Sequence, residues 1–205
     1  MSSTIEKIYN KRKNQTNRAS NFTMLEDKRG ALLKEIVGIK KNILDIGCRD
    51  GALTKYFSKN NTVLGVDIDE SALTEAKKNL GIETKIVDLN GSWSEIINRK
   101  FDVVVAGEVL EHLYFPESVT EKVYKHLNNG GIFVGSVPNG FSLKNRIRLL
   151  FAKKRFTSLG DPTHINHFHI DELVNIFKKH FSNVEIIGLS RYERLAKLSP
   201  GLFAF

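Results

Sequence analysis

Carboxylates and histidines with spacings suited to proton transfer or metal binding lie in two stretches of this chain. Glu111 and His112 follow Glu108 by three and four residues, so all three share one face if the segment forms a helical turn. A later stretch holds three histidines close together, His164, His167 and His169. Imidazole and carboxylate groups in such a set can act as general bases or bind a divalent cation.

Glycines and acidic residues in the first half of the chain suit a nucleoside site. Gly47 and Gly51 directly follow an apolar run, where a tight turn presents backbone amides to a ligand. Asp67 is placed to contact two ribose hydroxyls, and Asp88 is placed to accept a hydrogen bond from an adenine amine. Arg49 breaks the G-x-G-x-x-G spacing of dinucleotide sites, and no lysine follows the glycines as a P-loop requires. We therefore expect an adenosine that carries something other than phosphates.

These residues come directly after predicted strands. Apolar runs and turn signals predict six strands and a short seventh, at residues 42–46, 62–66, 83–87, 101–106, 132–137, 184–189 and 202–205. Helices are predicted over 22–37, 52–58, 71–80 (capped by Ser71), 93–97, 116–126, 141–151 and 171–180. This alternation is typical of an α/β fold with a doubly wound, mostly parallel sheet and helices on both faces. Such sheets bind ligands at the carboxyl ends of their strands.

The composition is that of one globular domain. The chain has 205 residues, and Cys48 is its only cysteine, which excludes a disulfide and a cysteine metal cluster. No apolar run approaches the length of a membrane span, and the N-terminus lacks the apolar core of a signal peptide. We therefore expect a cytoplasmic protein.

The net charge of +8 is concentrated in two places. Residues 1–41 hold ten Lys/Arg against four Asp/Glu, and residues 141–155 hold six Lys/Arg and no acid. A basic excess of this kind either attracts RNA, phosphate groups or a membrane surface, or is simply a solvated face.

Five stretches in order carry a resemblance to a known family. They are ILDIGCRDG, VDID, VDLN, FDVVVAGEVLEHL and LNNGG. Together they resemble the class I S-adenosylmethionine-dependent methyltransferases over roughly residues 40–190. The resemblance implies a Rossmann-like, seven-stranded sheet whose last strand is antiparallel.

The resemblance implies S-adenosyl-L-methionine as the cofactor, bound at the ends of the first four strands. The methionine end would be held by residues of the first turn, Asp45, Gly47, Cys48 and Gly51. The ribose would bind Asp67, and the adenine would contact Ile68, Asp88 and Leu89. The sulfonium would lie beside Gly107 and Glu108. Arg49 departs from the family, which has glycine at that position, at a cost of about 1 kcal/mol if the backbone there favours glycine.

We expect a single methyltransferase domain spanning residues 1–205, with four regions in order. A basic arm and helix over 1–40 precede the cofactor-binding half, 41–140. A basic lid and histidine-rich loop follow over 141–169, and a C-terminal helix and strands complete the domain over 170–205. The lid stretch FSLKNRIRLLF, followed by DPTHINHF, resembles that of methyltransferases with sugar, surface-glycan and lipid-linked substrates.

Methyl transfer from a sulfonium is an in-line displacement, so catalysis is mostly alignment, sometimes with a base. We expect catalysis to depend on Glu111, His112, His164 and His167, with His112 and a loop histidine forming a general-base pair. The predicted acceptor is a small molecule, a sugar or a lipid-linked group, methylated on oxygen or nitrogen without a metal. Arg146, Arg148 and the N-terminal arm would contact an anionic acceptor, an anionic surface or RNA, and no obligate protein partner is implied.

Two alternatives stay open. The pattern E-x-x-E-H with a later H-x-x-H is similar to the metal site of RNA 3′-terminal 2′-O-methyltransferases, in which the metal holds the terminal ribose. Alternatively, the chain is a non-catalytic, cofactor-binding module, an interpretation that Arg49 favours.

Overall fold

The computed structural model describes residues 25–190 and 197–200. The predicted N-terminal arm and the predicted strand at 202–205 lie outside the described residues. The chain divides into two compact units, which are described separately. Unit 1 comprises Met1–Gly107 and His126–Gly135, and unit 2 comprises Glu108–Lys125 and Ser136–Phe205.

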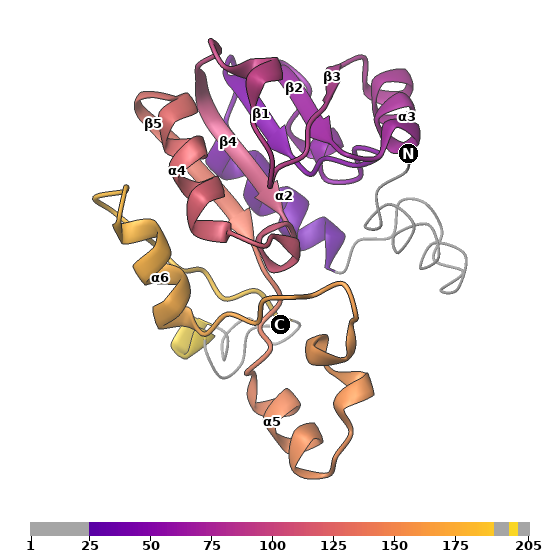
Figure 1. Cartoon of the computed structure of the whole chain (residues 1–205), viewed down its shortest axis with the longest axis vertical. Coiled ribbons are helices and arrows are strands. Elements are labelled where there is room, and N and C mark those ends of the chain that lie inside the picture. The colour runs from indigo at the N-terminus through magenta and orange to yellow at the C-terminus, as the bar shows by residue number, and fades with distance from the viewer. Residues whose placement is uncertain (1–24, 191–196, 201–205) are drawn as a thin grey trace. The chain divides into compact units, whose positions relative to one another are not determined.

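A five-stranded sheet organises unit 1 (Figure 1). Its strands are β1 (Asn42–Ile46), β2 (Thr62–Asp67), β3 (Glu83–Ile86), β4 (Phe101–Gly107) and β5 (Leu127–Ser136), in the order β3-β2-β1-β4-β5. β1 pairs in parallel with β2 and β4, and β2 pairs in parallel with β3. The α/β class and the parallel sheet are therefore confirmed, although the described residues form five strands where seven were expected over the whole chain.

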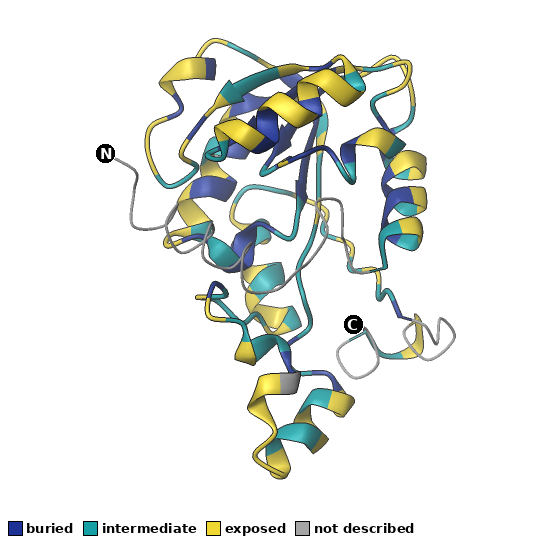
Figure 2. Ribbon diagram, turned by 90° about the vertical axis from the view of Figure 1, so that its right-hand side faces the viewer, coloured by how far each residue is buried: buried dark blue, intermediate teal, exposed yellow. Residues whose placement is uncertain are grey.

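The strands of the sheet centre are buried on both faces, as their continuous apolar runs predict (Figure 2). One face carries Ile43, Val63 and Val103, which pack in one cluster with side chains of α2 (Glu26–Val37) and α3 (Glu70–Leu80). Leu44, Leu64 and Val104 alternate onto the other face and are fully buried. Each buried aliphatic side chain contributes about 1.5–3 kcal/mol, which fixes the strand ends that carry the polar residues.

Four local predictions for unit 1 were wrong. The helix expected over 52–58 is only a 3₁₀ turn, η1 (Thr54–Tyr56), because the Thr54 hydroxyl donates to Asp45 within the sheet and ties the segment to β1. α3 is capped by Asp69, whose carboxylate accepts from Ala72 N, and not by Ser71. β5 begins at Leu127 and not at Ile132, and the predicted turn glycine Gly130, with φ 75°, lies within the strand. A further 3₁₀ turn, η2 (Ser94–Ile96), stands where a short helix was expected.

Unit 2 contains helices joined by irregular segments. They are η3 (Leu110–His112), α4 (Pro116–His126, whose last residue belongs to unit 1), α5 (Leu143–Leu150), η4 (Lys154–Phe156), η5 (Ser158–Gly160) and α6 (Ile170–Lys178). The strand predicted over 184–189 is wrong, since these residues form no ladder. Alternating apolar residues specify two faces, but a strand forms only where a neighbour offers its backbone groups. Within the described ranges, no helix has both the length and the apolar character needed to cross a membrane.

Candidate cofactor site and histidine cluster

The order in which successive strands are added to the sheet reverses between β1 and β4. The chain builds outward from β1 through β2 to β3 and then returns to place β4 on the other side of β1. In an open parallel sheet, ligands bind outside the carboxyl ends of the strands at this point. Gly47 follows β1, and Gly107 ends β4. Unit 1 therefore places two of the three predicted cofactor glycines, Gly47 and Gly107, at its switch point.

Glycine is required in the turn after β1. Gly47 and Gly51 adopt φ 70° and φ 81°, a region that L side chains rarely enter. A Cβ on Gly51 would lie 2.5 Å from Leu80 Cδ1, so this glycine also allows α3 to pack closely. The amides of Gly47 and Cys48 donate to Val66 O at 2.8 and 3.2 Å. These bonds attach the turn to the end of β2, where the next functional residue stands.

Asp67 is held in place by two backbone amides. Its Oδ2 accepts from Arg49 N at 3.0 Å, and its Oδ1 accepts from Asp69 N at 2.9 Å. The residue is 8% exposed, and burial raises the pKa of Asp67 above its usual value against the lowering effect of the two amides and the Arg49 guanidinium. A carboxylate oxygen accepts more than one hydrogen bond. The fixed carboxylate can therefore receive two further hydroxyls, as a ribose diol would require.

Asp45 and Cys48 point into the protein. Asp45 Oδ2 accepts from the Thr54 hydroxyl at 2.6 Å, and burial raises the pKa of Asp45 to about 7. A Cβ on Gly65 would lie 2.7 Å from Cys48 Sγ, so Gly65 makes room for the Cys48 side chain inside the sheet. Burial and the charges of Asp45 and Asp67 raise the pKa of the Cys48 thiol, which keeps it protonated. The structure thus gives both side chains packing roles beneath the predicted methionine site.

The predicted adenine residues lie around the end of β3. Asp88 is exposed, and its Oδ1 accepts from Asn90 N at 2.9 Å, which orders the turn after the strand. Leu89 and Ile68 are half-buried, and Leu89 O accepts from Trp93 Nε1 at 3.3 Å. An acidic group after β3 and partly exposed apolar side chains after β2 and β3, which are neighbouring strands, suit an adenine edge and its ring.

Arg29 is a candidate cofactor residue that the sequence analysis missed. It comes from α2, is only 6% exposed, and its Nη2 lies 3.6 Å from the position of a Cβ on Gly107. A buried guanidinium beside the switch point suits a carboxylate, which it can bind with two hydrogen bonds. The available signal was its place on the apolar face of the helix, four residues before Leu33 and eight before Val37.

Two residues beside the predicted site have left-handed backbones without being glycine. Arg49 adopts φ 46°, so the position where the family resemblance implies glycine does favour it conformationally. Glu108, the first residue of unit 2, adopts φ 60° and donates its amide to Ser136 O at 2.9 Å. Strained backbone of this kind clusters at functional sites.

Unit 2 brings Glu111, His112 and His164 together. A ligand atom from each lies within 4.8 Å of the others. His112 Nε2 is 3.9 Å from Glu111 Oε1, and the His112 and His164 rings meet edge to face at 4.8 Å between centroids. His112 Nδ1 lies 2.8 Å from Thr163 O. Because a carbonyl can only accept, Nδ1 carries the proton and neutral His112 keeps the basic lone pair on Nε2.

The histidine loop is fastened to η3 by backbone bonds. The amides of Ile165 and Asn166 both donate to Glu111 O, at 2.9 and 3.0 Å. Asn166 Nδ2 also donates to Leu110 O and Leu113 O. These bonds hold the histidine loop against η3, which lies about fifty positions earlier in the chain, and so fix the positions of the loop imidazoles.

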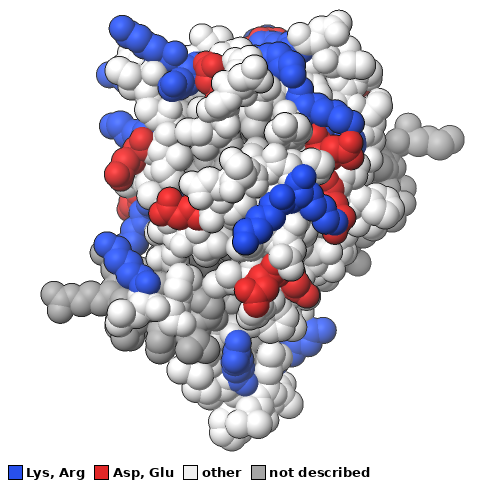
Figure 3. All heavy atoms as spheres, turned by 90° about the vertical axis from the view of Figure 1, so that its left-hand side faces the viewer, with Lys and Arg blue, Asp and Glu red and all other residues white. Residues whose placement is uncertain are grey.

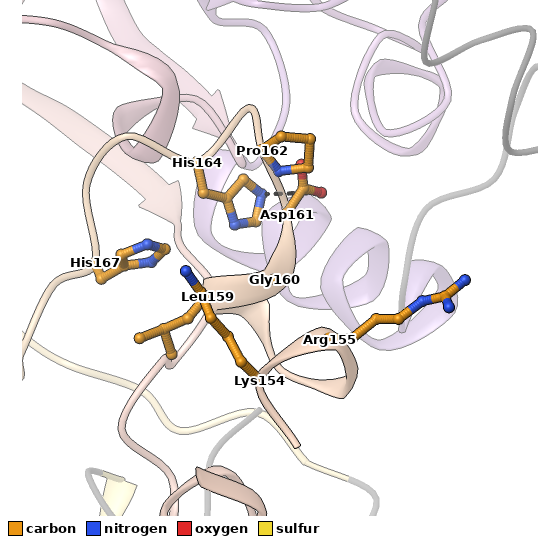
Figure 4. A pocket seen from close by; sticks show the side chains of 8 residues that line it. All are labelled: Lys154, Arg155, Leu159, Gly160, Asp161, Pro162, His164 and His167. Atoms are coloured by element: carbon orange, nitrogen blue, oxygen red, sulfur yellow. Dashed lines mark ion pairs between the residues drawn. The ribbon is translucent and has the colours of Figure 1, made fainter. Parts of the chain in front are cut away.

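A cavity of about 500 Å³ opens beside the loop and is lined by charged residues and imidazoles (Figure 4). Lys154 extends toward His164 and His167, whereas Arg155 points away from them. His164 Nε2 lies 3.7 Å from Asp161 Oδ2, so the loop holds its own carboxylate beside this histidine. Partial burial and the Lys154 charge lower the pKa of His167.

The structure gives the predicted catalytic residues different roles. Glu111, His112 and His164 form one cluster, His167 lies on the cavity wall, and Glu108 is not in the cluster. His169 caps α6, since its Nδ1 accepts from Asp171 N and Glu172 accepts from its amide. Sequence reasoning missed Asp161 and Lys154 as members of the site. The positions of predicted residues agree with proton transfer but do not test it.

Comparison with known proteins identifies the family. A model described as a methyltransferase domain matches residues 11–185. The chain belongs to this methyltransferase family. A ribosomal protein L11 methyltransferase from Clostridium botulinum is 34% identical over 108 residues, which are 51% of this chain and 34% of that protein. The chain thus spans about a third of the length of this relative.

Two further comparisons cover more of this methyltransferase domain. A ubiquinone biosynthesis O-methyltransferase from Hydrogenovibrio crunogenus is 27% identical over 170 residues, 76% of this chain and 70% of that protein. The crystal structure of an S-adenosylmethionine-dependent methyltransferase from Mesorhizobium loti superposes with a TM-score of 0.62 at 16% identity, covering 83% and 88% of the two chains. At that identity the structural likeness supports the fold.

Proposed function

We propose that the protein is an S-adenosylmethionine-dependent methyltransferase acting on a small-molecule, sugar or lipid-linked acceptor, at oxygen or nitrogen. Membership of the methyltransferase family supports the reaction. The observation that carries the cofactor assignment is the Asp67 carboxylate, fixed by two amides at the end of β2. Its geometry fits a ribose diol, and the turn lacks the lysine that a phosphate-bearing nucleotide would favour.

The residues of unit 1 fit S-adenosylmethionine. Asp67 would hold the ribose, Asp88 with Ile68 and Leu89 would receive the adenine, and Arg29 would bind the methionine carboxylate. When bound, the cofactor supplies an activated methyl group on its sulfonium. The protein's own contribution is to bind and orient both reactants and to accept a proton where the acceptor releases one.

His112 is the proposed base. The Thr163 carbonyl fixes its tautomer, so Nε2 can take the proton of a hydroxyl or an ammonium group. Glu111 is 1% exposed and lies beside this nitrogen, where a negative charge would stabilise the imidazolium that forms. His164 packs against the same ring and restricts its orientation.

The proposed acceptor carries an anionic group such as a phosphate or a carboxylate. The cavity in unit 2 has the size of small-molecule sites, and Lys154, Arg155 and His167 line it. Phosphate and carboxylate groups are the usual partners of such side chains. A cytoplasmic location remains a prediction.

Cofactor binding tests the first part of the proposal. Calorimetry with S-adenosylhomocysteine should show binding, and Asp67→Ala should weaken it by about 10- to 100-fold, the value of hydrogen bonds to a charged group. Glu75→Ala on the exposed side of α3 is the matched control and should leave affinity unchanged. Absence of binding to both S-adenosylmethionine and S-adenosylhomocysteine would overturn the enzyme assignment.

Turnover tests the second part. Release of S-adenosylhomocysteine should be measured over a panel of hydroxyl and amine acceptors, each with and without a phosphate or carboxylate. His112→Gln should lower kcat by about 10²–10⁴ at unchanged cofactor affinity. Equal rates with charged and neutral acceptors would contradict the assignment of the cavity.

A second candidate function is metal-dependent methylation of an RNA 3′-terminal ribose. The observation that favours it is the cluster of Glu111, His112 and His164, a donor set that suits divalent transition metals. Ligands around an ion at about 2.1 Å lie about 3.0–3.4 Å apart, so the widest separation in the cluster would have to shorten by about 1.5 Å to bind one. Activity on short RNA that is lost with a chelator and restored by Mn²⁺ or Mg²⁺ would favour this candidate.

A further inference from the structure

The helix α5 exposes its apolar side chains to solvent. None of its residues is buried, and Figure 2 colours it in the exposed and intermediate classes. Leu143, Ile147, Leu150 and the adjoining Phe151 are 41%, 50%, 82% and 67% exposed. At about 100° per residue these four positions fall on one side of the helix. A helix that packs on a core would bury this side.

Two polar side chains bond the helix to the segment that precedes it, Asn145 from the opposite side and Arg146 from the edge of the apolar side. Asn145 Nδ2 donates to Asn139 O at 3.0 Å, and Arg146 Nε donates to Phe141 O at 2.7 Å. Asn145 lies about 180° around the helix from the centre of the apolar side. The apolar side therefore faces outward, while Asn145 on the other side bonds to the preceding loop.

Basic residues surround this apolar side. Residues 141–155 hold Lys144, Arg146, Arg148, Lys153, Lys154 and Arg155, and no acidic residue. Elsewhere, on the face drawn in Figure 3, Lys/Arg and Asp/Glu side chains are interspersed. Apolar side chains bordered only by positive charge are complementary to a surface with an apolar interior and anionic headgroups.

We propose that residues 143–155, here called the docking segment, bind the chain peripherally to an anionic membrane surface. Leu143, Ile147, Leu150 and Phe151 would enter the headgroup boundary, and the basic side chains would contact the lipid phosphates. Peripheral binding needs no membrane-spanning helix, and none of the helices in the described residues is long and apolar enough to form one. Nucleic acid fits this surface less well, because it offers no apolar phase for the four exposed side chains.

The docking segment also reaches the cavity of unit 2. Lys154 and Arg155 belong to the segment and line the cavity. If the proposed function holds, on which this consequence rests, membrane binding brings the acceptor cavity to the level of the headgroups. A lipid-linked acceptor with an anionic headgroup then becomes the favoured substrate class.

Vesicle binding tests the docking segment without requiring enzyme activity. The full chain should sediment with vesicles of phosphatidylcholine and phosphatidylglycerol but not with phosphatidylcholine alone. The double variant Leu150→Ser/Phe151→Ser should reduce partitioning at least about tenfold. Lys144→Gln and Lys153→Gln should each reduce partitioning onto anionic vesicles about fivefold at about 0.1 M salt. At about 1 M salt the effect of each substitution should be smaller, because salt screens the attraction. Ile97→Ser, at a 69% exposed apolar position in unit 1, and Lys77→Gln are matched controls that should bind normally.

Each alternative outcome is distinguishable. The proposal is overturned if wild-type protein ignores anionic vesicles, or if the docking-segment variants bind them as the controls do. It is also overturned if these variants lose affinity for a short RNA but not for vesicles. If they lose affinity for S-adenosylhomocysteine alone, the helix serves the cofactor site. Absence of cofactor binding with normal vesicle binding would instead overturn the proposed function and leave the docking segment supported.

Discussion

Replacing Arg49 by glycine should stabilise this protein. Arg49 adopts φ 46°, a left-handed conformation that costs a residue with a Cβ about 1–2 kcal/mol. Glycine removes this cost, but it also gives the unfolded chain more conformational freedom, which offsets about 0.4–1 kcal/mol of the stabilisation. Arg49 is exposed, so its attraction to Asp67 is well screened and its loss matters little. The balance predicts a gain of about 0.5–1 kcal/mol for Arg49→Gly.

Urea unfolding of Arg49→Gly and Arg49→Ala separates backbone strain from charge. Alanine removes the guanidinium but keeps the Cβ, and therefore keeps the strain. We expect Arg49→Gly to raise the midpoint at constant m-value and to raise Tm by about 1–4 °C. Arg49→Ala should give no gain.

The reasoning is refuted if the two variants are equally stable, because the left-handed backbone would then cost nothing. It is also refuted if Arg49→Gly is the less stable of the two. A parallel measurement of S-adenosylhomocysteine affinity shows whether the arginine contributes to the cofactor site. If Arg49→Gly binds S-adenosylhomocysteine with wild-type affinity, having arginine instead of glycine at this position does not affect cofactor binding.

Other residues give predictions of the same kind. Glu108→Gly should stabilise by about 0.5–1 kcal/mol in urea unfolding, whereas Glu108→Ala should not, because φ is 60° there. Burial raises the pKa of Asp45 to about 7, so the folded state holds this proton more tightly than the unfolded state. The stabilisation that this tighter proton binding gives to the folded state is therefore complete below about pH 4, and it is lost as the pH rises to about 7. Asp45→Asn, which can still accept from Thr54, should flatten this decline, and parallel curves for variant and wild type would contradict the assignment. Lys154→Gln should raise the pKa of His167, measured by NMR titration, since the Lys154 charge lowers it.

The sheet was predictable because its signals are local. The run from Ile43 to Ile46 is apolar, short and closed by glycine, and those properties alone specify a buried strand and a turn. Asp67 was predictable for the same reason, since a strand end followed by an acid needs no knowledge of distant residues. The helix expected after Gly51 failed because a single hydroxyl, Thr54, bonds to Asp45 nine residues earlier. Hydrophobic spacing carries no information about that bond.

Arg29 shows a different limit of sequence reasoning. Its position on the apolar face of α2 was visible, but an arginine among leucines is also compatible with a side chain that reaches back to solvent. The fold decides between the two by burying the guanidinium, with Nη2 3.6 Å from the position of a Cβ on Gly107. The two residues are far apart in the chain, so neither position identifies the other.

The three histidines of the 161–169 loop show why the acceptor could not be predicted from the same sequence. All three looked alike, yet His164 joins Glu111, His167 lines the cavity, and His169 caps a helix. Their roles depend on bonds from Ile165 and Asn166 to a carbonyl about fifty residues earlier, which set the loop on η3. Because the proposed base and the cavity wall both depend on the bonds to that carbonyl, we expect small changes in this loop to alter the acceptor while leaving the cofactor turn unchanged. Substrate choice in this chain is therefore expected to depend on the loop and not on the glycine turn.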